Sequence, residues 1–348
     1  MDARMEVGPE ALEAALRRSG TLDDSQRVSG CRIRPIGAGQ LADSFLGSLE
    51  YDGEPGPATV FVKLPTADPD SASTASRIGA YRREQRFYET LLPRLDLRTP
   101  RLLGVLETEG DEPGLILEDL SVRARPLDQL SDGTVSQVVS AMQQLPGLQA
   151  PFWDDPDLGE RPWFYNRTTD HIEGLHERYE ISWGRHCRSI TPALAPEEIE
   201  IVETFGERCV DWAKGIQGPS TLVHQDLRLD NLLHGSDGAW LIDWQTLAWG
   251  SPAWDPAFLL GSALEPVDRR AIERDRVASQ VRALAARGVD WEFDFAWTEY
   301  RRHSGAVLLG MVPAMAFVEP TERGFEMFRS LIARGARQAL DLNLTDFL

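Results

Sequence analysis

The stretch TLVHQDLRLDNLLHGSDGAWLIDW, from Thr221 to Trp244, carries most of the information about the fold of this chain. Two apolar segments, NLLH and AWLIDW, flank the turn signal GSDG, and this pattern predicts a β-hairpin. Four aspartates and one asparagine alternate here with leucine, isoleucine and tryptophan, which belong in a core. The polar side chains therefore either form a structural cluster or hold a charged ligand, and we favour the ligand.

The expected register of the hairpin predicts a metal site. Antiparallel pairing around the turn brings Asn231 opposite Ile242, within one register step, and sets the Asn231 amide beside the Asp243 carboxylate. Carboxylate and carboxamide oxygens suit Mg²⁺, which takes few protein ligands and keeps phosphates and waters. Asp226 precedes Asn231 by five residues and is placed to accept a proton from a hydroxyl. We expect only turn or capping roles for Asp230 and Asp237.

The segments HQDLRLDN and LIDW resemble the H-G-D-x-x-x-x-N and I-D-[FW] motifs of the aminoglycoside phosphotransferase and choline-kinase-like family, which is related to the protein kinases. The resemblance implies that Asp226 is the catalytic base and that Asn231 and Asp243 bind metal. It also implies ATP and Mg²⁺ as cofactors. The late segment of the chain resembles the bacterial ecdysteroid-kinase-like branch.

Four residues around this motif have less certain roles. Gln225 stands where the family usually has glycine, so its side chain either narrows the backbone choices of the loop or reaches the substrate. Arg228 either binds a phosphate or pairs with a neighbouring carboxylate. His224 and Asp255 are expected to brace the loop rather than to touch the substrate.

A kinase-like small lobe also needs a strand lysine for the α- and β-phosphates and a helix glutamate to hold that lysine. The strand-like segment VFVKLP supplies Lys63. Glu84 shares a helix face with the apolar residues Tyr81, Tyr88 and Leu91, so it is expected to be buried and to need a cation. We predict an ion pair between Lys63 and Glu84.

Two further segments complete the predicted nucleotide site. In IGAGQLADSF, Gly37 and Gly39 would let backbone N–H groups approach phosphate oxygens. By resemblance, the segment LILEDL is the hinge, in which backbone groups of Glu118, Asp119 and Leu120 would pair with adenine.

The pattern of elements predicts two domains. Residues 1–120 read as short strands with an N-terminal helix and one further helix over Ser73–Leu92, whereas residues 121–348 are mostly helical and hold the hairpin. The resemblance, which extends from about Ile33 to Asn343, implies a protein-kinase-like two-lobe fold of the α+β class. Its small N-terminal lobe is an antiparallel sheet that binds nucleotide, and its larger C-terminal lobe is mostly helical.

Composition limits the choice of partners. The 348 residues are 42% hydrophobic and 26% charged, with a formal charge of −19, which argues against nonspecific binding to nucleic acid. The charge would attract a cationic substrate or would only keep the protein in solution. The three cysteines are widely separated, which favours a reducing, cytoplasmic location. The longest apolar stretch, Ala306–Val318, is too short to span a bilayer, so no membrane association is expected.

Together these features predict a small-molecule kinase that moves the γ-phosphate of Mg-ATP to a hydroxyl group. The alternative is a nucleotide-binding pseudoenzyme that acts as a scaffold or regulator. Two acceptor classes stay open within the kinase interpretation. The negative charge favours an aminoglycoside, and the aromatic-rich stretch Trp163–Trp183 favours a hydrophobic or sterol-like alcohol.

Overall fold

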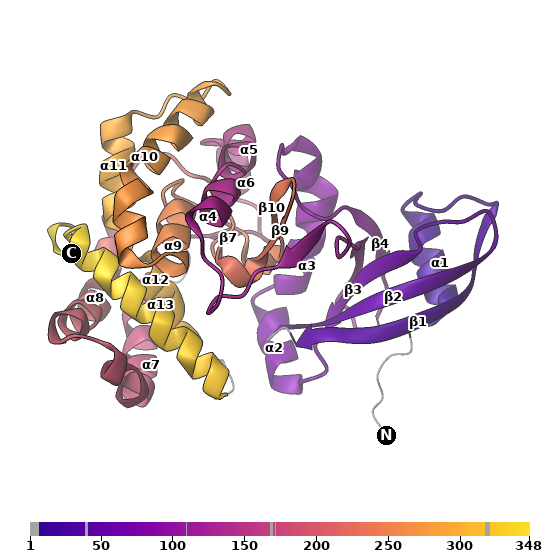
Figure 1. Cartoon of the computed structure of the whole chain (residues 1–348), viewed down its shortest axis with the longest axis horizontal. Coiled ribbons are helices and arrows are strands. Elements are labelled where there is room, and N and C mark those ends of the chain that lie inside the picture. The colour runs from indigo at the N-terminus through magenta and orange to yellow at the C-terminus, as the bar shows by residue number, and fades with distance from the viewer. Residues whose placement is uncertain (1–6, 39–40, 109, 168–169, 171, 317–320) are drawn as a thin grey trace. The chain divides into compact units, whose positions relative to one another are not determined.

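The computed structural model describes residues 7–38, 41–108, 110–167, 170, 172–316 and 321–348. The chain divides into two compact units (Figure 1). The first comprises Met1–Arg94, Thr99–Arg125 and Asp243–Gln245, and the second comprises Leu95–Arg98, Pro126–Ile242 and Thr246–Leu348. Antiparallel strands dominate the first unit and helices dominate the second, so the fold is α+β as predicted.

A five-stranded antiparallel sheet forms the first unit. The strands lie in the order β1 (Gln26–Ala38), β2 (Ala42–Gly53), β3 (Thr59–Pro65), β5 (Gly114–Glu118) and β4 (Leu102–Leu106). The pairing of β2 with β3 sets Ser44 opposite Lys63, and that of β3 with β5 sets Lys63 opposite Leu115. Lys63 is therefore held on a central strand of the sheet.

Helix α1 (Pro9–Arg18) packs on this sheet. Its apolar stripe of Leu12, Ala15 and Leu16 is buried against apolar side chains of the strands, which is the expected arrangement for an amphipathic helix. Gly104 of β4 allows the close approach, because a Cβ atom at this position would lie 3.0 Å from the backbone carbonyl carbon and oxygen of Ala15.

The prediction of one continuous helix over Ser73–Leu92 is wrong. The segment forms α2 (Pro69–Arg77) and α3 (Ala80–Arg86), followed by a π-helical turn over Phe87–Leu91 and a 3₁₀ turn over Leu92–Arg94. Gly79 separates the two helices with a φ of 69°, a left-handed conformation that glycine adopts at little cost. The face that carries Glu84 nevertheless lies inward, as its spacing with Tyr81 and Tyr88 predicts.

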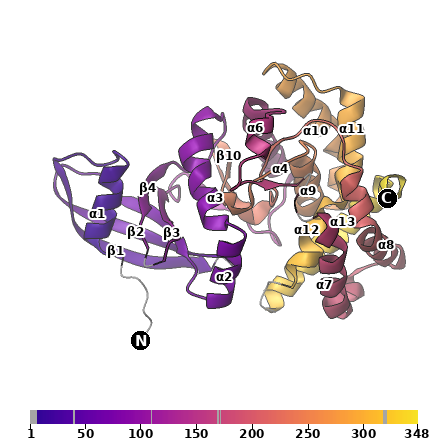
Figure 2. The same cartoon turned by 180° about the vertical axis from the view of Figure 1, so that it is seen from behind.

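The second unit is built around a group of long helices. Its helices are α4 (Val135–Met142), α5 (Leu145–Gln149), α6 (Pro156–Gly159), α7 (Leu175–Ile190), α8 (Pro196–Lys214), α9 (Trp254–Ala263), α10 (Pro266–Ala285), α11 (Phe293–Arg302), α12 (Ala306–Ala314) and α13 (Glu322–Asp341). Both views show α12 beside α13 and α7 beside α8 (Figures 1 and 2). Aromatic side chains of α8 and α9, among them Phe205, Trp212, Trp254 and Phe258, fill the core between these helices.

Short strands complete the second unit. The sheet β7–β11–β8 contains β7 (Tyr165–Asn166), β11 (Ala248–Gly250) and β8 (Thr221–Val223), and the predicted hairpin is β9 (Leu232–Gly235) with β10 (Gly238–Leu241). In the three-residue strand β6 (Ala124–Pro126), the chain passes from the first unit to the second, between Arg125 and Pro126. In the described part of the chain, no helix is both long enough and apolar enough to span a membrane.

Candidate active site

The loop between β8 and β9 carries the motif HQDLRLDN, and its last three residues form a 3₁₀ turn, Leu229–Asn231. In the hairpin that follows, Gly235 pairs with Gly238 and Leu232 pairs with Leu241. One step further, the Ile242 N–H donates to the Asn231 carbonyl oxygen at 3.1 Å. The predicted opposition of Asn231 and Ile242 is therefore confirmed.

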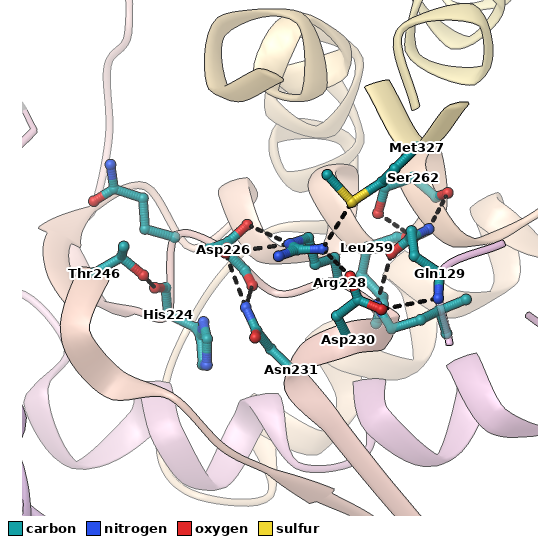
Figure 3. Close-up of polar contacts among 12 residues, drawn as sticks. Gln129, His224, Asp226, Arg228, Asp230, Asn231, Thr246, Leu259, Ser262 and Met327 are labelled. Carbon is teal, nitrogen blue, oxygen red and sulfur yellow. Dashed lines mark hydrogen bonds and ion pairs between the residues drawn. The ribbon is translucent and has the colours of Figure 1, made fainter. Parts of the chain in front are cut away.

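Two side chains hold the Asp226 carboxylate (Figure 3). The Asn231 amide nitrogen donates to the Asp226 backbone oxygen at 2.7 Å and to its Oδ2 at 2.9 Å. The Arg228 Nε lies 3.3 Å from both carboxylate oxygens. The Asp226 side chain is still 28% exposed, so a hydroxyl group can reach the oriented carboxylate. This combination of fixed orientation and access suits a general base.

Arg228 forms ion pairs with two carboxylates of the protein itself, so its guanidinium is already engaged before a ligand binds. Its guanidinium bridges Asp226 and Asp230, and its Nη1 also lies 3.4 Å from the Met327 sulfur (Figure 3). Burial would lower the Arg228 pKa, but the two carboxylates raise it above its ordinary value. Asp230 also accepts the Gln129 N–H at 2.9 Å, a contact with a residue far away in the chain rather than the turn or cap expected for it.

Gln129 supports the motif loop, a role that the sequence did not predict. Its side chain is fully buried, its Oε1 accepts the Leu229 N–H at 3.0 Å, and its Nε2 donates to the Ser262 carbonyl at 3.0 Å. It therefore ties the motif to the end of α9 (Figure 3). A lone glutamine about 100 residues away along the chain gives no periodic or motif signal, so no pattern could have identified it.

Asp255 and His224 support the motif loop through hydrogen bonds, as predicted. The fully buried Asp255 carboxylate accepts the backbone N–H groups of His224 at 2.8 Å and of Gln225 at 2.9 Å. Burial raises the Asp255 pKa, and His224 and the two N–H groups oppose that shift. The His224 Nε2 lies 2.9 Å from the Ile242 carbonyl oxygen, which links the loop to the second strand of the hairpin.

Gln225 has a left-handed backbone with a φ of 73°. This conformation costs a non-glycine residue roughly 1–2 kcal/mol, a cost that glycine would avoid. Both of its backbone polar groups are satisfied, because Asp255 accepts the N–H and the Trp254 indole N–H donates to the carbonyl at 2.9 Å. A strained residue that is held this firmly calls for a functional reason.

In the first unit, Lys63 lies between two carboxylates. Its Nζ is 2.7 Å from Glu84 Oε2 and 3.0 Å from Asp243 Oδ1, so the ion pair expected between Lys63 and Glu84 is present. Burial would lower the Lys63 pKa, but Asp243 and Glu84 raise it above its ordinary value. Burial raises the pKa of Glu84 even though Lys63 opposes the shift. The lysine is therefore a firmly protonated cation.

Trp244 positions Asp243 within the first unit. Its ring stacks on Phe87 with centroids 3.9 Å apart, and its indole N–H donates to Thr99 Oγ1 at 3.0 Å. The Trp244 backbone N–H donates to Glu84 at 3.3 Å. Asp243 itself has a left-handed φ of 66°, and its side chain is 39% exposed.

Part of the backbone in the segment proposed to pair with adenine is already hydrogen-bonded within the protein. The Glu118 N–H donates to the Arg101 carbonyl at 2.9 Å, and the Leu120 carbonyl accepts the Arg123 N–H at 2.8 Å. A nucleotide role for the remaining groups of Glu118, Asp119 and Leu120 stays a prediction.

Only one of the two glycines of the predicted phosphate-covering turn lies in the described part of the chain. Gly37 lies near the end of β1, and Gly39 lies outside the described residues. Their contribution to phosphate binding stays a prediction.

The donors expected to hold Mg²⁺ are chemically suited to it. The Asn231 nitrogen is used by Asp226, and no described residue donates to its Oδ1, so the carboxamide oxygen is available as a ligand. Lys63 contacts one oxygen of Asp243 in a side chain that is 39% exposed. No group of three or more His, Cys, Asp or Glu placed to hold a metal occurs among the described residues. Mg²⁺ does not require one, because it binds through one or two carboxylates plus phosphates and waters.

Comparison with solved structures supports the kinase-like fold. Choline kinase from Cryptosporidium parvum Iowa II is 11% identical, with a TM-score of 0.58 and 91% of each chain covered. Ethanolamine kinase from Plasmodium vivax is 12% identical, with a TM-score of 0.55 over 95% of this chain and 86% of the other. The gentamicin complex of APH(2″)-IIa is 14% identical, with a TM-score of 0.52 over 90% and 94%.

Sequence comparison gives the family. No curated protein sequence matches the chain significantly. The model of the phosphotransferase enzyme family matches residues 32–303, which include Lys63, Glu84, Asp226, Asn231 and Asp243. The match covers most of the chain, and the chain therefore belongs to the phosphotransferase enzyme family.

Proposed function

We propose that this protein is an ATP-dependent O-phosphotransferase that acts on a hydroxyl group of a small molecule. The observation that carries the proposal is the environment of Asp226. Asn231 and Arg228 orient its carboxylate by hydrogen bonds, and the same carboxylate stays partly exposed. Membership of the phosphotransferase family supports the same chemistry.

In the proposed reaction, Asp226 accepts the proton of the acceptor hydroxyl as the acceptor oxygen bonds to the γ-phosphorus. The bond between that phosphorus and the β,γ-bridging oxygen breaks, and ADP leaves with the bonding electron pair. Asn231 and Arg228 keep the carboxylate aimed throughout, because both contact it before any ligand binds. Proton transfer of this kind contributes about 10²–10⁴-fold to the rate.

The first unit would bind the nucleotide. Lys63 is held by Glu84 in a protonated state, and its ammonium group is suited to the α- and β-phosphate oxygens of ATP. Asn231 and Asp243 are the residues that would hold Mg²⁺. When bound, Mg²⁺ offsets the negative charge on the phosphates.

Substitution of Asp226 tests the proposal. Thermal shift with Mg-ATP reports nucleotide binding, and a coupled ADP assay with a panel of alcohols reports transfer. We expect Asp226→Asn to reduce transfer by about 10²–10⁴-fold while nucleotide affinity stays within a few-fold. Asp237→Asn makes the same chemical change in the exposed hairpin turn and serves as the matched control.

Two outcomes would contradict the proposal. Normal turnover by the Asp226 variant would remove its assignment as the base. Binding of Mg-ATP without transfer to any alcohol in the panel would favour the nucleotide-binding scaffold instead.

A further inference from the structure

The second unit contains a cavity of about 220 Å³, and one of its lining residues, Arg167, contacts Gln225 of the motif loop. It lies among β7, α7, α8, α9 and the 3₁₀ turn His303–Gly305. Its polar and aromatic wall includes Tyr165, Arg167, Asp170, Trp212, Trp254 and His303. Binding pockets for drug-sized ligands are larger, about 300–1,000 Å³, so this cavity suits a molecule of about one ring.

Arg167 dominates the chemistry of the cavity. Its guanidinium carbon lies 3.6 Å from the centre of the Trp254 ring, which is stacking distance. Among the described residues, no carboxylate lies within ion-pair distance of it. Burial lowers the Arg167 pKa to about 10, although Tyr165 and Asp255 oppose the shift, so the side chain is still cationic at neutral pH. A half-buried cation that has no carboxylate within ion-pair distance is suited to binding an anionic group.

The other charged groups of the cavity are already engaged. The Asp170 carboxylate accepts the Asn166 N–H at 2.7 Å, and Lys214 pairs with Glu173 at 2.6 Å. Burial lowers the His303 pKa to about 4, so that ring is neutral at pH 7. The charge that remains for a ligand is therefore the positive charge of Arg167.

Gln225 holds Arg167 in place. With the amide oriented to satisfy both of its ends, Oε1 accepts from Arg167 Nη1 at 2.7 Å and Nε2 donates to the Thr246 carbonyl at 3.0 Å. Trp254 contacts both residues, because its ring lies under Arg167 and its N–H donates to the Gln225 carbonyl. This arrangement gives a reason for a glutamine at a left-handed position, and it ties the cavity to the residue that precedes Asp226.

We propose that this cavity binds the acceptor, a small alcohol with a flat apolar ring and a carboxylate that pairs with Arg167. The inference rests on the proposed function and names its substrate class. The ring would lie against the partly exposed apolar side chains of Ile172, Leu175 and Ile216, and the carboxylate would complete the coordination that Gln225 begins. The guanidinium of Arg167 would repel a polycationic aminoglycoside. A sterol would be larger than the cavity.

The test uses three probes that share one ring and one hydroxyl. They are para-(hydroxymethyl)benzoate, para-(hydroxymethyl)benzamide and para-(hydroxymethyl)benzylamine, with charges of about −1, 0 and +1 at neutral pH. Calorimetry without nucleotide measures binding, and the coupled assay with Mg-ATP measures transfer. We expect the benzoate to bind at least about tenfold more tightly than either of the other probes, which corresponds to about 1.4 kcal/mol.

Three variants locate the effect. Arg167→Gln should remove the preference for the benzoate. Gln225→Gly should weaken benzoate binding several-fold while the melting temperature stays the same or rises, because glycine relieves the left-handed backbone. Arg208→Gln also removes a guanidinium, but from an exposed pair with Asp211 outside the cavity, and it should leave binding unchanged.

The outcomes separate this inference from the proposed function. Benzoate binding that depends on Arg167, without transfer to any alcohol, supports the cavity assignment and contradicts the kinase. Transfer to an aminoglycoside that Arg167→Gln leaves intact supports the kinase and overturns the cavity assignment. Equal binding of the three probes, or tightest binding of the benzylamine, also overturns it.

Discussion

The Lys63 ammonium lies 2.7 Å from one oxygen of Glu84, and both side chains are nearly buried, with exposed fractions of 11% and 2%. Asp243 adds a second carboxylate at 3.0 Å. One cation therefore neutralises one of two adjacent acids, and the group as a whole keeps a net negative charge. Removing the lysine would leave Glu84 buried without its counter-charge, which makes this contact important for stability.

Lys63→Met should reduce both stability and transfer. Breaking a buried ion pair from one side costs about 3–5 kcal/mol, and loss of the ammonium removes the proposed phosphate ligand. Lysine occurs at only two positions in the sequence, 63 and 214, and Lys214 lines the proposed acceptor cavity, so Arg208→Met, which also removes a cation, is the control. Arg208 pairs with Asp211 at the surface, where a pair contributes about 0–1 kcal/mol. Urea unfolding and Mg-ATP titration measure the two effects.

The double variant Lys63→Met/Glu84→Gln distinguishes a structural from a chemical role. Neutralising Glu84 removes the unpaired charge, so most of the lost stability should return while nucleotide affinity stays low. Recovery of transfer together with stability would show that Lys63 acts only through folding.

Asp255→Asn should impair the loop that carries Asp226. The carboxylate accepts two backbone N–H groups, from His224 and Gln225, whereas an amide can accept only one and turns its NH₂ group toward the other. A buried donor without an acceptor costs about 1–3 kcal/mol. We expect a lower melting temperature and at least a tenfold lower kcat, with Asp237→Asn as the control. An unchanged kcat would mean that the loop keeps its shape without this anchor.

Local patterns and the family resemblance together predicted much of the fold and part of the site. The hairpin register followed from a turn signal between two apolar segments. The contact of Lys63 with Glu84 followed from the resemblance to a kinase-like small lobe, and only the choice of Glu84 as the buried acid rested on helical periodicity.

The contacts that sequence reasoning missed join residues far apart in the chain. Gln129 supports Leu229 from 100 positions away, and Arg167 meets Trp254 only after the second unit folds. A single glutamine or arginine in a loop has no periodicity, so its partner depends on packing alone. The break at Gly79 was missed because isolated glycines are tolerated within helices as well as at their ends.

Gly104→Ala should destabilise the first unit. Its added Cβ would lie 3.0 Å from the Ala15 backbone carbonyl carbon and oxygen and 3.3 Å from the Leu16 nitrogen, and backbone atoms cannot rotate away as a side chain can. Overpacking of this kind costs about 1–3 kcal/mol. Gly184→Ala is the matched control, because Gly184 is exposed on α7 with nothing within 4 Å of the added atom. It should stabilise the protein by up to about 1 kcal/mol in urea unfolding.

His303 should make stability depend on pH in the acid range. It is fully buried, its Nδ1 donates to the Glu299 carbonyl at 2.8 Å, and its Nε2 has no partner among the described residues. Burial lowers its pKa to about 4, and nearby Arg302 and Arg167 act in the same direction. The unfolded chain, with an ordinary pKa near 6.5, therefore binds a proton that the folded protein excludes between about pH 6.5 and pH 4. Stability contributed by the neutral ring is complete above pH 6.5 and declines as the pH falls through this window.

His303→Gln tests this linkage, because glutamine can still donate to the Glu299 carbonyl and does not titrate. A pKa lowered from about 6.5 to about 4 corresponds to about 3 kcal/mol, so the native protein should lose about that much more stability than the variant between pH 7 and pH 4. Glu299, whose pKa is raised by burial, is present in both proteins, and to a first approximation its contribution cancels in the comparison. Urea unfolding at closely spaced pH values measures the difference. Parallel stability curves for the two proteins would mean that His303 takes up its proton equally well in the folded chain.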